Sequence, residues 1–192
     1  MKFKYYDVFS HLVPGYLIYQ ILIFLYEDLP DIEVLPSIAI AFILGYFVNT
    51  IGSWLENFYR YFYRGKPSMN LLKGKDIAKV KFYRSKEVRE LIKNECKDEN
   101  PSEEKLFSIA ISYANQSDNS RVSDFNASYA LSRSFLTGLL IIFTLLVVEL
   151  YASVWVYLVM IPLIFITWRR LMERDYYYAR EVLFTYLNKT KQ

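Results

Sequence analysis

The side chains with the greatest chemical reactivity occur singly in this sequence of 192 residues. There is one histidine, His11, and one cysteine, Cys96. Metal centres and histidine-dependent catalysis need such groups in clusters, and Gly65 and Gly74 stand alone instead of forming a phosphate-binding loop. We therefore expect no enzyme, no metal and no cofactor. His11 is expected to hydrogen-bond to a neighbouring helix, with pH sensing as the alternative.

A regular spacing of small and polar side chains marks the second apolar segment. Four of them recur at intervals of four residues, which places them on one face of a helix, and a further glycine lies beside them. Small residues let membrane helices approach closely, and an amide in lipid needs a partner. This face predicts packing within one helical bundle, an interface between copies of the chain, or the lining of a pore. The residues are Ala41, Gly45, Asn49, Gly52 and Ser53.

Basic residues gather after this segment. Between Arg60 and Lys93 there are 11 basic and 3 acidic residues. Basic side chains near a membrane attract anionic headgroups at about 1 kcal/mol each, and the same charges could recruit a partner. Nucleic-acid binding stays open, because membrane topology alone produces such an excess. The candidates for partner or headgroup contact are Arg60, Arg64, Lys66, Lys73, Lys75, Lys79, Lys81 and Arg84.

The elements that position these residues follow from composition. The chain is 54% hydrophobic yet 22% charged, and its mean hydropathy of +0.12 excludes a chain that is apolar throughout. The two kinds of residue are segregated: 8–26 and 34–55 carry no charge, and 134–168 carries only Glu149. As helices the first two are about 28 and 33 Å long, close to the hydrocarbon core of about 30 Å. The third is too long for one crossing and predicts a hairpin. We expect an all-α membrane protein with four transmembrane helices, at about 8–26, 34–55, 133–149 and 153–168.

Charge placement orients these spans. Residues 27–34 hold four acidic residues and no Lys or Arg, and every basic residue lies before the first span, between the second and third, or after the fourth. By the positive-inside rule, both termini and the central region are expected to face the cytoplasm. A soluble helical core is the alternative. The expected organisation is a first transmembrane hairpin (1–55), a cytoplasmic helical domain (56–131), a second hairpin (132–168) and a cytoplasmic C-terminal helix (169–192).

Several helices are expected in the cytoplasmic region. Aromatic and basic residues at 54–64 extend the second span, and apolar periodicity predicts a helix over 76–96. Pro101 and the acidic residues after it mark another helix start. The tail 169–187 predicts an amphipathic helix continuous with the fourth span.

Two stretches carry a resemblance to known proteins. They are YDVFSHLVPGYLI at 6–18 and GYFVNTIGSWLE at 45–56. They resemble small multi-span proteins encoded in prokaryotic antiviral defence loci, such as the membrane accessory protein of type VI-B CRISPR systems. The resemblance covers about 25 residues. It implies a membrane-embedded effector or regulator, a multimeric pore being one form, that works with a cytosolic sensor and has no catalytic residues.

These observations lead to two functional hypotheses. The first is an oligomeric accessory or effector protein of antiviral defence that perturbs the membrane or forms a pore in response to a cytosolic protein or RNA–protein partner. The alternative is a non-conducting membrane anchor or scaffold that recruits a cytosolic protein or nucleic-acid complex. A transporter subunit is not supported, because no pair of broken helices is seen.

Overall fold

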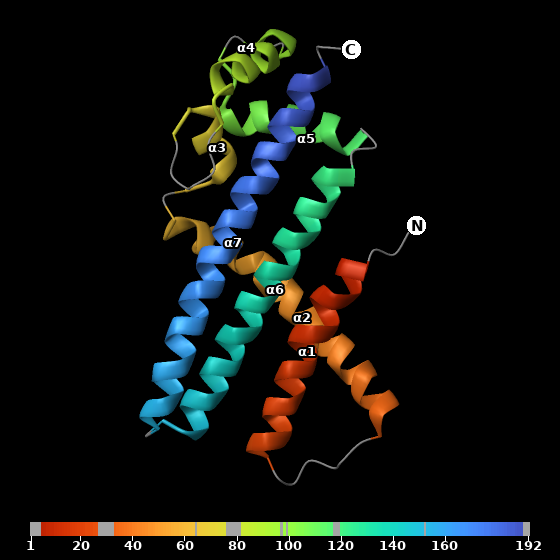
Figure 1. The fold of residues 1–192 in the computed structure, drawn as a ribbon, viewed down its shortest axis with the longest axis vertical. Coiled ribbons are helices and arrows are strands. Elements are labelled where there is room, and N and C mark those ends of the chain that lie inside the picture. The colour runs from red at the N-terminus through yellow and green to blue at the C-terminus, as the bar shows by residue number, and fades with distance from the viewer. Residues whose placement is uncertain are drawn as a thin grey trace. The chain divides into compact units, whose positions relative to one another are not determined.

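The computed structural model describes residues 5–26, 33–63, 65–75, 82–96, 98, 100–116, 120–151 and 153–189. Within these ranges the chain forms α-helices and no strand, which confirms the all-helical expectation (Figure 1). The helices are α1 (Tyr5–Leu25), α2 (Val34–Tyr61), α3 (Pro67–Leu72), α4 (Ser85–Glu95), α5 (Glu103–Gln116), α6 (Ser120–Glu149) and α7 (Val154–Lys189).

Four of these helices, α1, α2, α6 and α7, are long and apolar enough to cross a membrane, as predicted. Three of them continue well beyond their apolar stretches, because polar flanks do not interrupt helical hydrogen bonding. The second helix ends near Gly65, whose φ of +96° lies in the left-handed region that suits glycine. The fourth apolar stretch and the C-terminal helix are a single helix, α7, which confirms the predicted continuity.

The polar helices follow their sequence signals in part. Ser102 precedes α5, and its Oγ accepts a hydrogen bond of 3.2 Å from the backbone N–H of Lys105, an arrangement typical of a helix N-cap. The helix expected over 76–96 begins only at Ser85 in the described residues, because Phe82–Arg84 precede it in a turn. Residues 76–81 lie outside the described residues.

The chain divides into two compact units, and each is described by itself. Unit 1 comprises Met1–Asn57 and Ala130–Leu171, and unit 2 comprises Phe58–Tyr129 and Met172–Gln192. The division therefore falls within α2, α6 and α7. Each of these three helices thus contributes residues to both units, whereas α1 belongs to unit 1 alone.

Unit 1 has a small apolar core and an apolar exterior. Ile18, Val48, Ile142 and Met160, one from each of the four long helices, form the core cluster. Large hydrophobic side chains also cover the outside, and Trp155, for example, is 75% exposed. Soluble proteins rarely expose large contiguous apolar surfaces. Such an exterior is compatible with a membrane-embedded protein.

Unit 2 is built around the C-terminal half of α7. Side chains of α7 are buried at helical spacing, and Tyr176, Leu183 and Tyr186 are fully buried. The short helix α3 is tied to α7 by Asn70, whose Nδ2 donates a 3.0 Å hydrogen bond to the hydroxyl of Tyr176. Burial raises the pKa of the Tyr176 hydroxyl above its ordinary value. Unit 2 thus has an apolar interior along this half of α7.

Candidate functional site

The small residues of α2 face α1 within the same chain. A Cβ atom added to Gly45 would lie 1.7 Å from the backbone oxygen of His11, and one added to Gly15 would lie 1.8 Å from the backbone oxygen of Ala41. Both distances are far below van der Waals contact, so only glycine fits at these positions. Ala41 is completely buried. The crossing of α1 and α2 in Figure 1 is therefore a contact between backbones.

Asn49 is the centre of a polar cluster on the same side of α2. Its Oδ1 accepts hydrogen bonds of 3.1 Å from Arg133 and 3.1 Å from Ser134, and its Nδ2 lies 3.3 Å from Nε2 of His11. Arg133 also donates 2.8 Å to Glu56. The contact between His11 and Asn49 confirms the expected hydrogen bond of the histidine to a neighbouring helix. The cluster joins α1, α2 and α6.

The last two residues of the predicted face lie differently. A Cβ on Gly52 would lie 2.7 Å from Oγ1 of Thr137, so this glycine packs against α6, whereas Ser53 is exposed. Four of the five predicted positions are thus used for packing within one chain. The role of this face in oligomerisation or pore lining stays a prediction.

A polar residue outside the predicted set faces outward instead of packing against a neighbouring helix. Gln20 lies on α1 between Tyr16 and Phe24, and all three side chains are exposed on one face of the helix. Among the described residues, the Gln20 side chain has no hydrogen-bond partner. The sequence shows that Gln20 lies inside an apolar segment. It does not show which way the side chain faces, since α1 is apolar around its whole circumference.

The basic candidates begin in the last turn of α2, and the first of them, Arg60, is partly buried. Arg60 makes a two-bond ion pair with Asp175 (2.6 and 3.0 Å), and the Asp175 side chain is only 4% exposed. Arg60 also donates 3.4 Å to the hydroxyl of Tyr129. Arginine presents a rigid fork that matches a carboxylate in this way. Arg60 is therefore engaged inside unit 2.

The other basic candidates lie at the surface of unit 2 or outside the described residues. Lys66 pairs with Glu104 at 2.7 Å, and Arg84 donates 2.6 Å to Glu87. The side chains of two further candidates are exposed; these are Lys73 and Lys75. Three candidates lie outside the described residues: Arg64, Lys79 and Lys81.

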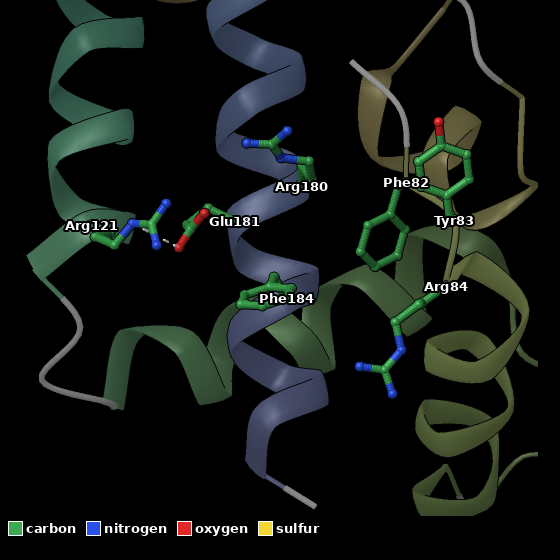
Figure 2. A pocket seen from close by; sticks show the side chains of 7 residues that line it. All are labelled: Phe82, Tyr83, Arg84, Arg121, Arg180, Glu181 and Phe184. Carbon is green, nitrogen blue, oxygen red and sulfur yellow. Dashed lines mark ion pairs between the residues drawn. The ribbon is translucent and has the colours of Figure 1, made fainter. Parts of the chain in front are cut away.

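One of these residues, Arg84, lines a pocket of unit 2. The pocket has a volume of about 370 Å³ and brings together three segments of the chain (Figure 2). Its lining residues are Phe82, Tyr83, Arg84, Arg121, Arg180, Glu181 and Phe184. Sequence reasoning found only Arg84, because nothing in the linear sequence brings the start of α6 and the end of α7 to the same place.

The described residues contain no group of three or more His, Cys, Asp or Glu side chains that could hold a metal ion. The fold is that of an all-helical protein with four helices long and apolar enough to span a membrane. The chain matches no family model, no curated protein and no solved structure.

Proposed function

We propose that this chain is a multi-pass protein of the bacterial inner membrane that acts as an oligomer. In this proposal both termini and unit 2 face the cytoplasm, and a cytosolic partner triggers perturbation of the membrane as part of antiviral defence. The observation that carries the oligomer is the outward-facing Gln20 on α1.

The depth of Gln20 makes its exposure costly. With a rise of 1.5 Å per residue, Gln20 lies about 14 Å along α1 from His11 and about 9 Å from Tyr26. The His11 end contains the Asn49 cluster, and at the other end the Tyr26 hydroxyl donates 2.8 Å to Glu149. Gln20 thus lies between two polar levels, within the apolar part of the helix. Polar side chains at such depths face protein or water, because lipid offers no hydrogen bonds.

A second copy of the chain satisfies this side chain. The amide of glutamine is both donor and acceptor, so Gln20 residues from neighbouring copies can pair with one another. The contact then runs along the exposed α1 face that includes Tyr16 and Phe24, while the α2 face holds α1 in place within each chain. A ring of such glutamines around a water-filled path would also satisfy the amides. Membrane leakage distinguishes the ring from a closed interface.

The test replaces Gln20 by leucine. Hydrogen bonds between membrane helices contribute about 1–2 kcal/mol in model peptides, so Q20L should weaken association about 5- to 30-fold. The measurement is the mass of the detergent-solubilised particle across protein concentrations, together with dye leakage from liposomes. The matched control is T144V, because Thr144 is also exposed on an apolar helix but its hydroxyl bonds to Leu140 O within α6. If Q20L and T144V have the same mass distribution as the wild type, the α1 contact is wrong.

The role in defence has its own test. Cells that carry the gene with its neighbouring genes should survive phage infection better than cells that carry Q20L in the same setting. Equal plaque counts for the wild type and Q20L would show that defence does not depend on association through Gln20.

A non-conducting anchor is the second candidate, and one observation favours it. The predicted α2 face is already packed within one chain at Ala41, Gly45, Asn49 and Gly52. A single copy therefore completes its own α2 contacts. If the protein is an anchor, liposomes containing it retain their dye, and reversing the exposed charges of Lys73 and Lys75 abolishes co-purification of the cytosolic partner.

A further inference from the structure

The pocket of unit 2 lies along one face of α7. Figure 2 shows Arg180 and Phe184, one helical turn apart, between two flanking groups. Arg121 and Glu181 lie on one side, and the Phe82–Arg84 segment lies on the other. The pocket thus combines a helix surface with side chains from two further segments of unit 2.

Three arginines and one carboxylate border the pocket, while most of its accessible lining is apolar. Glu181 is 3% exposed and forms an ion pair of 3.4 Å with Arg121, and Arg84 pairs with Glu87. Arg180 lies over the ring of Tyr177, 5.0 Å from its centroid, and has no ion-pair partner among the described residues. An anion is therefore the ligand that this side chain lacks.

Guanidinium groups favour one class of anion in particular. Their planar fork donates two parallel hydrogen bonds to a phosphate. A lipid phosphate does not fit the position, because Arg180 lies twelve residues beyond Trp168, about 18 Å along α7 from the end of its apolar stretch. The headgroup layer extends only about 5–8 Å beyond the hydrocarbon.

The aromatic side chains indicate what accompanies the phosphate. Phe184 is 40% exposed and Tyr83 is 84% exposed, whereas Phe82, which also lines the pocket, is only 8% exposed. Exposed rings next to arginines form a surface on which nucleobases stack. The volume of about 370 Å³ falls within the range of about 300–1,000 Å³ typical of small-molecule sites.

We propose that this pocket binds a nucleotide, with the base against Phe184 and the phosphate on Arg180. Arg121, held by Glu181, borders the same site. The proposal does not depend on oligomerisation, because every residue in it belongs to unit 2. It gives the cytosolic part of the proposed membrane protein a soluble ligand of its own.

The test measures binding of the four 5′-mononucleotides AMP, GMP, CMP and UMP to the full-length protein in detergent by isothermal titration calorimetry. At least one should bind, and its nucleoside and ribose 5-phosphate should each bind at least tenfold more weakly. R180Q and F184L should each weaken binding at least tenfold. The matched control is R174Q, because Arg174 lies on the same helix, does not line the pocket and has no ion-pair partner among the described residues.

Three results would overturn the nucleotide-site proposal. If none of the four nucleotides binds, or if R180Q and R174Q have equal affinities, the pocket is not a nucleotide site. Ribose 5-phosphate binding as tightly as the nucleotide would identify a simple phosphate site and overturn the proposal. Circular dichroism of each variant shows that a loss of binding does not come from unfolding. The particle mass of R180Q should equal that of the wild type. A loss of nucleotide binding in R180Q can therefore be told apart from a loss of oligomerisation.

Discussion

Replacing Gly45 by alanine should separate α1 from α2. The added Cβ would lie 1.7 Å from the His11 oxygen, 2.4 Å from its carbonyl carbon and 2.9 Å from its Cα. All three are backbone atoms, so no side-chain rotation relieves the clash. Ordinary contact begins at about 3.5 Å, and α1 must therefore move by about 1.8 Å at the crossing.

The cost of this movement has two parts. Overpacking a well-packed site costs about 1–3 kcal/mol, and the upper value applies because the clash is with backbone. The hydrogen bond between Asn49 and His11 is already 3.3 Å long and is lost on a shift of this size, at about 0.6 kcal/mol for a membrane helix pair. Alanine gains up to about 1 kcal/mol over glycine in helix propensity. The net loss for G45A is about 2–3 kcal/mol.

The assay is reversible unfolding in mixed micelles with increasing sodium dodecyl sulfate, followed by circular dichroism. The matched control is G138A on α6, because its Cβ would lie 3.3 Å from Cβ of Pro14 and no closer than 3.9 Å to Cα of Pro14 and Cγ1 of Val48. That variant should change the free energy of unfolding by less than about 1 kcal/mol. Equal stabilities for G45A and G138A would show that α1 and α2 do not cross at Gly45.

Two further predictions concern unit 2. R60Q should lower the free energy of unfolding by about 3 kcal/mol, because it leaves the carboxylate of Asp175 buried without its arginine. The double variant R60L/D175L should lose less stability than R60Q, as measured by thermal unfolding. An equal or larger loss for the double variant would contradict this explanation. Because burial raises the pKa of Tyr176, the folded state holds the phenolic proton more tightly than the unfolded chain. The resulting stability is complete below pH of about 10 and is lost as the pH rises through the folded pKa. Unfolding measured across this alkaline range should decline less steeply for Y176F, and identical slopes would refute the assignment.

The four apolar helices could be predicted because their signal is local. An uncharged run such as 34–55 has no alternative in water or lipid that satisfies its backbone as well as a helix does. The start of α6 was less predictable, since this helix begins at Ser120, well before its apolar stretch, without any change in local chemistry that the apolar pattern detects. Continuation of a helix costs little once it is formed.

The candidate sites, like the helices, could be predicted from the sequence only in part. The spacing of Gly45 and Asn49 predicts a face, but the partner of that face depends on how distant segments pack. Arg133 and Glu56 are 77 residues apart in sequence and meet only in the folded chain. Arg60 illustrates the limit most clearly, because its sequence context indicates a surface cation whereas Asp175, 115 residues later, draws it into the interior. A run of charges therefore does not predict the contacts that its members make.

The two polar levels of unit 1 explain why Asn49 is paired within the chain and why Gln20 stands out. Arg133 and Glu149 are sixteen residues apart on α6, which corresponds to about 24 Å, and His11 and Tyr26 are about 22 Å apart on α1. Both lengths are shorter than a hydrocarbon core of about 30 Å. In the proposed membrane position, the Asn49 cluster therefore reaches into the edge of the hydrocarbon, where unpaired polar groups are costly. The chain meets this cost by pairing Asn49, Arg133 and Glu56 internally. Gln20 lies between the two levels and is too far from either to share their partners, so its amide is left without a hydrogen bond among the described residues, which is the basis of the proposed contact between copies.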